Sequence, residues 1–472
     1  MNRFEAVVAG ILVSDEPKQS ASESLVIDNC NFSNAKAGII AGGGPINLTT
    51  DVMTIENSVA FGIRVVGLNT DDIDFYLTNS EITGTGNTLT NYSGVAVENY
   101  VSGGIITTRV DNSVVSDNSN RGLTFRGNNT PGSVVGFINN STIEGNAFNR
   151  LIVGNGYGVI SNMGAQVTIS ESILSNNSTN NTATDYDAVI GNNEGGPSGT
   201  TSGIVAVQSS SITATVGTLV ASSGTGAQFD ASSNWWGTTT EASIAASVTG
   251  TDFSPWLDSG TDTDAGTAGF QPNNDRLNVG LSGVQTGGME RIQEVISSYT
   301  ATDTVIIHAG IYPENPTIDR NITFQTIPTV TLDQLTMNGT GVVLTLDGNL
   351  DISSSGSVNL TDGNINVNSG SALQISNEAS PIVESTTSRI EGTISFSKPT
   401  NLDMSGGFDF LGVNFVSGAN DLVNLSISRI TGTQGVNAGS GGSSIGVTWQ
   451  LTADNTPDTW TINLSWSSLY DN

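Results

Sequence analysis

Hydrophobic and polar residues alternate in short runs along the first half of the chain, and the runs recur. Each run is followed by a polar residue, a serine and another apolar residue. Copies lie at residues 26–32, 53–58, 76–82, 110–115, 138–143, 167–174 and 207–212. Alternation with period two is typical of β-strands, and repeats of roughly 22–38 residues are typical of solenoids. The pattern predicts a stack of coils built from short strands.

A second apolar run belongs to each unit. Examples lie at residues 38–40, 62–65, 94–97, 122–125 and 151–153. Strands this short bury a face only when coils stack in register. Because crossover connections are right-handed, we expect a right-handed parallel β-helix over residues 1–258. Asparagine and serine at its corners favour left-handed backbone and hydrogen-bonded ladders, with a ligand-binding stripe as the alternative.

Tryptophan is concentrated where these repeats stop. Trp235 and Trp236 follow Asn234, and Trp256 lies in a second aromatic run with Phe253. A final coil has no neighbour above it, so large aromatic side chains there predict a structural cap with Trp235 buried. An exposed platform that stacks on sugar rings is the alternative.

Three further segments complete an all-β chain. Residues 259–285 form an acidic linker rich in glycine and threonine. Residues 286–400 predict a second, smaller β-helix, opened by a capping helix with apolar residues at helical spacing. Residues 401–472 predict a β-sandwich-like module that includes alternating strands at 445–451 and 460–466.

The charge of the chain limits the classes of partner that it can bind, and its cysteine content indicates a structural role for Cys30. The 472 residues include 14 basic and 44 acidic side chains, a net charge of −30. Nucleic acid is excluded as a partner because phosphate binding needs clustered lysine and arginine. The acidity suits either solubility or calcium binding by a secreted protein. Cys30, the single cysteine, takes a repeat position that serine fills elsewhere, so we interpret it as a small buried wall residue.

Two observations bear on location. No apolar run is long enough to span a bilayer, so the chain is not predicted to be transmembrane. Residues 1–10 lack the layout of a signal peptide and open directly in strand-like sequence. We expect a fragment of a longer extracellular or cell-surface protein, joined to other domains of its parent chain.

Candidate binding chemistry is spread over several coils. Four arginines in successive coils could line one face as a basic stripe for an acidic glycan: Arg109, Arg121, Arg126 and Arg150. Two acidic clusters could hold Ca²⁺ or lie in solvated turns, and they comprise Asp71, Asp72 and Asp74, then Asp262 and Asp264. A polar excursion at residues 176–197 is either a ligand-meeting loop or unstructured.

The second solenoid opens with a recognisable element. Gly310, Tyr312 and Glu314 form a Gly-x-Tyr-x-Glu sequence after a strand, which resembles the first coil of pectin methylesterases. Counterparts of the catalytic aspartates and arginine of that family are not found, so the element indicates fold. His308, the single histidine, lies in the preceding strand without an evident partner, and we interpret it as structural.

The junction itself also carries a resemblance. Residues 234–237, 253–257, 260–266 and 269–272 together resemble the closing coil of β-helix regions in large secreted surface proteins of Bacteroidota. The preceding repeats and the second stack are similar more loosely, and the last module resembles the one before their sorting tail. The resemblance implies export by the type IX route and a role as an adhesin or surface module.

Three functions therefore stay open. The first is a non-catalytic surface protein for adhesion or binding of a polysaccharide or cell-surface glycan. The second is a calcium-dependent polysaccharide lyase or a glycoside hydrolase of β-helix type, although no catalytic residue can be assigned. The third is a passive spacer or an ice- or mineral-binding surface.

Overall fold

The computed structural model describes most of the chain and divides it into two compact units. The first comprises Met1–Asn273 and Ser282–Gly287, and the second Asn274–Leu281 and Gly288–Asn472. The linker predicted at 259–285 is thus shared between them. The described residues are 2–5, 11–14, 23–42, 45–86, 92–146, 157–177, 186–192, 203–213, 218–222, 229–377, 382–385, 387–398, 408–410, 413–415, 423–431, 446–454 and 462–464.

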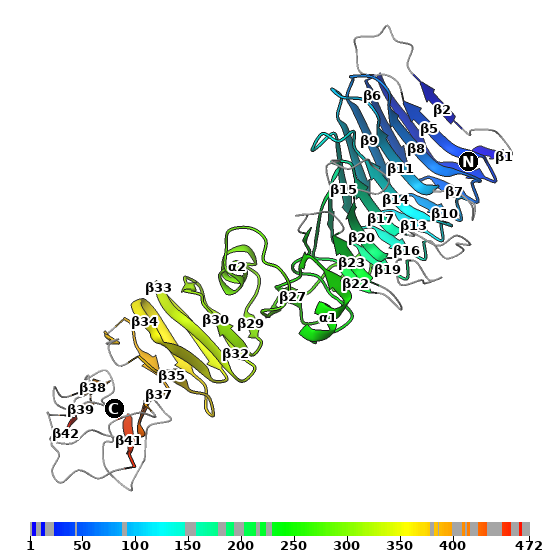
Figure 1. Ribbon diagram of the computed structural model, residues 1–472. Helices are drawn as coiled ribbons and strands as arrows, with labels where there is room; N and C mark the ends of the chain where they lie inside the picture. Colours follow the sequence, from blue (N-terminus) through cyan, green and yellow to red (C-terminus); the bar gives the residue numbers. More distant parts are fainter. Residues whose placement is uncertain are drawn as a thin grey trace. The chain divides into compact units, whose positions relative to one another are not determined.

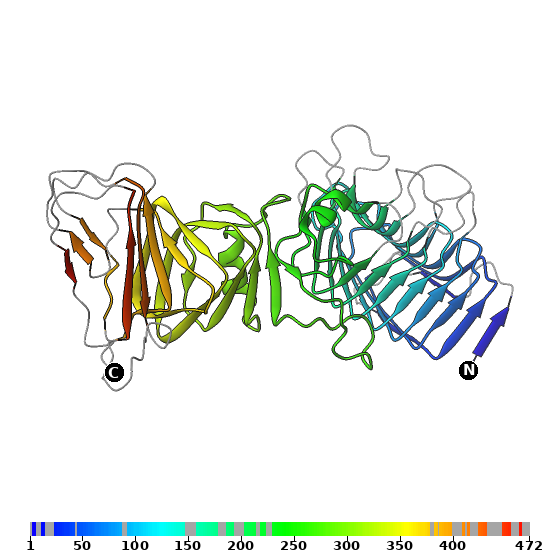
Figure 2. The ribbon, with the colours of Figure 1, turned by 90° about the horizontal axis from the view of Figure 1, so that it is seen from below.

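Three parallel sheets form the first unit, and the chain visits them in rotation (Figures 1 and 2). Sheet A contains β1 (Asn2–Glu5), β4 (Cys30–Ser33), β7 (Thr54–Glu56), β10 (Glu81–Thr83), β13 (Val114–Ser116), β16 (Thr142–Glu144), β19 (Ile173–Ser175) and β22 (Ser211–Thr213). Sheet B contains β2 (Ile11–Ser14), β5 (Ala37–Gly42), β8 (Phe61–Gly67), β11 (Ser93–Asn99), β14 (Arg121–Arg126), β17 (Tyr157–Asn162), β20 (Tyr186–Asn192), β23 (Thr218–Ser222) and β25 (Val248–Thr249). Sheet C contains β3 (Glu23–Asp28), β6 (Ile46–Asp51), β9 (Ile73–Thr78), β12 (Ile106–Asp111), β15 (Val134–Asn139), β18 (Gln166–Ser170), β21 (Ile204–Gln208), β24 (Phe229–Asp230) and β26 (Thr251–Asp252).

The predicted all-β architecture of stacked parallel strands is confirmed. Each strand pairs with the strand one coil later, so equivalent side chains meet in columns. In sheet A the inward column is continuous and buried, and it consists of Phe32, Ile55, Ile82, Val115, Ile143, Leu174 and Ile212. Burying such a column supplies the hydrophobic stabilisation that one coil cannot obtain alone.

The corner between sheets C and A repeats one backbone conformation. In each coil one residue there is left-handed, with φ between 46° and 53°. These corner residues are Asn29, Val52, Asn79, Asn112, Asn140, Glu171, Ser209 and Ser233. Asparagine tolerates this region and fills four of the eight positions, whereas Val52 is the one β-branched member of the series.

A serine ladder runs along the same corner, one residue after the left-handed position. The side-chain oxygen of each rung accepts the backbone N–H of the rung before it, over 2.8–3.2 Å. The rungs that accept are Ser80, Ser113, Ser141, Ser172, Ser210 and Asn234. Each serine hydroxyl also donates to the carbonyl two residues earlier. The predicted structural ladder is present, and its buried polar groups are satisfied.

A shorter asparagine ladder follows sheet A. The amide of Asn118 donates to Asn146 over 2.8 Å, and Asn146 donates to Asn177 over 2.8 Å. Thr85 donates to the first of these amides from the coil below. All three asparagines are buried, so the ladder fixes the register of these coils from a second corner.

The last coil closes the first unit. Trp236, Phe253 and Trp256 are buried against the solenoid core, and α1 (Glu241–Ser247) adds Ile244. The rings of Phe253 and Trp256 lie 5.7 Å apart. Trp235 is half-buried, so the expectation that it is buried is not met.

The second unit winds a further parallel stack. Its strands pair in the order β28 (Arg276–Val279), β29 (Thr304–Ile307), β32 (Ile322–Thr326), β33 (Val330–Asp347), β34 (Leu350–Val367), β35 (Leu373–Ile375) and β37 (Thr393–Lys398). β33 also pairs with β30 (Gly310–Tyr312) and β31 (Thr317–Ile318), and β34 with β36 (Ile390–Glu391). β33 therefore pairs in turn with three strands of the coil before it.

Antiparallel strands end the second unit. β40 (Leu425–Thr431) joins β37, and β41 (Val447–Thr452) joins β40. A separate antiparallel sheet contains β38 (Phe408–Phe410), β39 (Val413–Phe415) and β42 (Ile462–Leu464). The two alternating segments predicted near the C-terminus thus belong to different sheets.

Side chains from the second stack bind both ends of the predicted helix, α2 (Arg291–Ser298). The Glu314 carboxylate accepts the N–H groups of Arg291 and Ile292 over 3.1 and 2.9 Å. The Arg320 guanidinium donates to the carbonyls of Val295, Ile296, Tyr299 and Thr302. Negative charge at the N-terminus and positive charge at the C-terminus stabilise a helix dipole.

Candidate functional site

The described arginines of the predicted basic stripe belong to two sheets. Arg109 is on β12 of sheet C and stacks over the Phe137 ring at 4.6 Å. Arg121 and Arg126 are on β14 of sheet B, where the first is buried and the second half-buried. Arg150 lies outside the described residues. On sheet B, Arg126 lies among other polar and aromatic side chains suited to ligand binding.

Five side chains from β8, β11, β14 and the residue that follows β11 form one connected network, which we call the arginine–tyrosine row. Its members are Phe61, Arg64, Glu98, Tyr100 and Arg126. Arg64 stacks over Phe61 at 5.1 Å and pairs with the Glu98 carboxylate at 2.8 Å. The Tyr100 hydroxyl donates to Glu98 over 3.0 Å, and Arg126 stacks over the Tyr100 ring at 4.4 Å. The parallel register brings these strands together, placing Glu98 beside Arg126.

Burial and charge perturb two members of the row. Burial raises the pKa of Tyr100, and the Glu98 carboxylate raises it further. Burial acts to lower the pKa of Arg64, but the charge and hydrogen bond of Glu98, together with Tyr100, outweigh it and raise that pKa. Glu98 therefore neutralises Arg64, whereas none of the ion pairs among the described residues involves Arg126. That guanidinium is available to pair with an anionic group.

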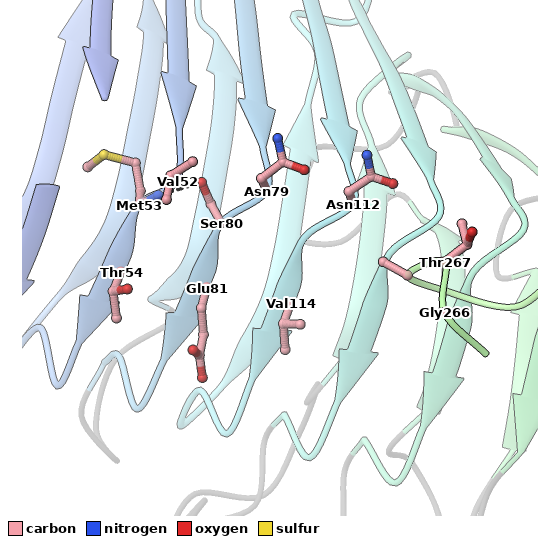
Figure 3. Close-up of a pocket in the computed structure, with 11 residues that line it drawn as sticks. Val52, Met53, Thr54, Asn79, Ser80, Glu81, Asn112, Val114, Gly266 and Thr267 are labelled. Atoms are coloured by element: carbon pink, nitrogen blue, oxygen red, sulfur yellow. Dashed lines mark hydrogen bonds between the residues drawn. The ribbon is translucent and has the colours of Figure 1, made fainter. Parts of the chain in front are cut away.

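A second feature is an open groove of about 580 Å³ along the corner between sheets C and A. Figure 3 shows the amides of Asn79 and Asn112 pointing the same way beside Thr267. The groove is lined by Val52, Met53, Thr54, Asn79, Ser80, Glu81, Asn112, Val114, Gly266, Thr267 and Ala268. We call it the corner groove.

The loop at 262–272 supplies one wall of the corner groove. Phe270 is buried, and its N–H donates to the Glu171 carbonyl over 2.9 Å. Gly269 packs so closely on Asn140 and Glu171 that a Cβ atom there would lie 2.2 Å from the Glu171 oxygen. The segment predicted as linker is thus docked on corner residues of the solenoid.

The predicted calcium ligands are engaged in local turns. The Asp262 carboxylate accepts hydrogen bonds from the N–H groups of Asp264 and Gln271. The Asp264 carboxylate accepts hydrogen bonds from the Thr267 hydroxyl and the Gly266 N–H. Asp72 accepts the N–H of Ile105 over 2.8 Å. Within the described ranges, no three histidine, cysteine, aspartate or glutamate side chains gather as metal ligands do. Calcium binding through Asp71, Asp72 and Asp74, or through Asp262 and Asp264, stays a prediction.

The other singled-out residues have these positions. His308 is half-buried and its Nε2 lies 3.0 Å from the Asn278 amide oxygen. Cys30 is half-buried, and its thiol contacts the Asp28 carbonyl in the manner of the ladder serines. The Trp235 indole packs against Gly260. Within the excursion at 176–197, the structure describes residues 176–177 and β20.

Sequence reasoning did not find Glu98, Tyr100 or the corner groove. Arg64 and Glu98 are 34 residues apart in sequence, and only the register between neighbouring coils brings them together. One signal for the groove was present in the sequence, because Val52 interrupts a corner series that is otherwise polar.

The chain matches no known family model, no curated protein and no solved structure. Among the described residues, no helix is long and apolar enough to cross a membrane. Function is therefore inferred from the chemistry of the chain's own surfaces.

Proposed function

We propose that the chain is a non-catalytic extracellular or cell-surface solenoid that binds an acidic glycan through the arginine–tyrosine row. The observation that carries the proposal is the row itself. Tyr100 offers an apolar ring with a polar tip, and Arg126 offers a planar guanidinium without a carboxylate partner among the described residues. A uronate residue combines a sugar ring with a carboxylate and suits both groups.

The proposal also includes the hand of the winding, the route of export and the cofactor. A right-handed winding of the first unit follows from the usual hand of parallel crossovers. The resemblance at residues 234–272 to surface proteins of Bacteroidota supports type IX export, a longer parent chain and an adhesive role. Abundant carboxylates make calcium a candidate cofactor.

The first test is a glycan array on the whole chain, with and without Ca²⁺. We expect binding to uronate-containing glycans, with a dependence on Ca²⁺ if the acidic loops take part.

Arg126→Ala should raise the Kd of an oligogalacturonate about tenfold or more, because a charge-assisted hydrogen bond contributes about 1.5–3 kcal/mol. Arg109→Ala is the matched control, since that arginine also stacks on a ring but lies on sheet C. Absence of glycan binding would favour a passive spacer or a mineral-binding surface.

One contact favours a second function, a polysaccharide lyase or glycoside hydrolase. The Tyr100 hydroxyl, the Glu98 carboxylate and the Arg64 guanidinium are joined by bonds of 2.8–3.0 Å, an arrangement able to move a proton near a bound uronate. Incubation with pectin and alginate, read as absorbance of unsaturated products, tests the lyase, and reducing-end release tests the hydrolase. Product formed by the wild type and lost in Tyr100→Phe would replace the non-catalytic proposal.

A further inference from the structure

The corner groove has the dimensions and the chemistry of a ligand site. Its volume of about 580 Å³ lies within the roughly 300–1,000 Å³ typical of small-molecule sites. Parallel register places Thr54, Glu81 and Val114 side by side on β7, β10 and β13. Each of these three strands therefore contributes a side chain to the corner groove.

Several polar side chains in the groove form no hydrogen bond with another residue in the described part of the chain. Among the hydrogen bonds of the described residues, none uses the side chains of Thr54, Glu81 or Asn112. The Asn79 amide donates to Asp51 over 2.8 Å, which orients its side chain. An amide both donates and accepts, so the groove offers neutral hydrogen-bonding groups beside one carboxylate.

Val52 supplies an apolar contact at a backbone cost. It adopts φ 49°, although a β-branched residue is strained in the left-handed region and six of the eight corners hold asparagine or serine. Val52 is 47% exposed and lines the groove with Val114, so burial does not explain its presence at this corner. Strain of this kind is found at functional sites.

The wall at 266–268 is held in place before any ligand arrives. Asp264 accepts the N–H of Gly266 and the hydroxyl of Thr267, which fixes the turn. Gln271 donates to the Asn140 amide over 3.4 Å and attaches the loop to the next corner. A preformed wall lowers the ordering entropy that binding must offset.

We propose that the corner groove binds one or two residues of a neutral saccharide. The hydroxyls of the sugar bond to Asn112, Thr54 and Glu81, and its apolar face packs on Val52 and Val114. The carboxylate of Glu81 and the absence of a cation among the lining residues disfavour an acidic ligand. This site uses other residues than the arginine–tyrosine row and does not depend on the function proposed for that row.

Binding is measured by titration of the whole chain with cellohexaose, maltohexaose and chitohexaose, by saturation-transfer NMR. We expect at least one of them to bind, and oligogalacturonate not to compete. Asn112→Gly keeps a residue suited to the left-handed corner but removes the amide, and Val52→Gly removes the apolar contact. Each should raise the Kd about fivefold, as expected for one lost contact of about 1 kcal/mol.

Asn29→Gly is the matched control, because it makes the same change at an exposed corner outside the groove. It should leave the Kd unchanged, as should Arg126→Ala. The proposal is overturned if none of the three hexasaccharides binds, or if binding is equally affected by Asn29→Gly and Asn112→Gly. Loss of binding in Arg126→Ala alone would assign the neutral saccharide to the arginine–tyrosine row instead.

Discussion

Individual residues at the corners decide how easily each coil turns. The left-handed backbone costs an ordinary L-residue about 1–2 kcal/mol, and asparagine offsets part of that cost. Seven corners carry asparagine, serine or glutamate, whereas Val52 carries a branched Cβ at φ 49°. A substitution of Val52 that relieves this strain should therefore stabilise the first unit, unlike an ordinary truncation of a surface side chain.

We predict that Val52→Asn increases the free energy of unfolding by about 1 kcal/mol, since it relieves the strained φ of an exposed residue. Urea unfolding followed by tryptophan fluorescence measures the change. The reverse substitution at an equivalent corner, Asn29→Val, should destabilise by a similar amount. Equal effects of the same sign in both variants would contradict the interpretation of strain.

Glu314 is the residue whose ionisation should be visible in stability. Its carboxylate is buried, and burial raises its pKa above the ordinary value of 4.5, with the nearby Glu290 adding to the rise. Hydrogen bonds from Ile292 and Arg291 act in the opposite direction. Because the folded state holds the proton more tightly, the contribution of protonation is complete below the unfolded pKa and is lost as pH rises through the folded pKa.

The stability difference between the wild type and Glu314→Gln should therefore move in favour of the wild type as pH falls from 7 towards 4.5. Denaturant titrations at several pH values supply this difference, and the variant subtracts the titration of all other groups. A flat difference, or one that moves in favour of the variant, would show that Glu314 does not carry the effect.

At the level of elements, the serine ladder replaces side-chain packing at one corner of the solenoid. Each rung satisfies an N–H that would otherwise be buried without an acceptor. Its members bond across 24 to 38 residues of sequence, so coils of different length meet at the same bond. The ladder therefore fixes register where the hydrophobic column alone would permit slippage.

We predict that Ser141→Ala destabilises the first unit by about 1–3 kcal/mol, because the N–H of Ser113 loses its acceptor in a buried position. Ser102→Ala, a change at an exposed serine of a turn, should have an effect close to zero. Unfolding in urea compares the two. A small effect of Ser141→Ala would mean that water or a shifted backbone satisfies the N–H.

The same elements show what the sequence can and cannot predict. The ladder was visible because Ser113, Ser141 and Ser172 recur at one point of each repeat, and α2 was visible from its apolar spacing. The arginine–tyrosine row was not, because Glu98 and Arg64 meet only through the register of unequal coils. The corner groove was not, because its wall depends on docking of a loop that composition identifies as a linker.

On the scale of the whole molecule, each compact unit has its own core. The second unit contains a buried ion pair, in which Arg429 of β40 donates to Glu384 through two nitrogens at 2.6 and 2.8 Å. Arg429 is only 4% exposed. Removal of one partner from a buried pair leaves a charge without compensation, a loss of about 3–5 kcal/mol.

We predict that Arg429→Met lowers the melting temperature of the second unit and leaves that of the first unit unchanged, because the two cores are separate. Differential scanning calorimetry of the whole chain should show two transitions, one of which moves. The double variant Arg429→Met with Glu384→Gln should recover part of the loss. A common shift of both transitions would show that the units unfold as one.

Because of the serine ladder, the number of residues in the chain does not by itself determine the length of the solenoid. Insertions between rungs add residues to a loop but leave the spacing between strands unchanged at about 4.8 Å. Duplication of one coil would instead lengthen the solenoid by that amount. Evolution can therefore vary the lengths of the loops in such a protein, whereas the number of rungs sets the length of the solenoid.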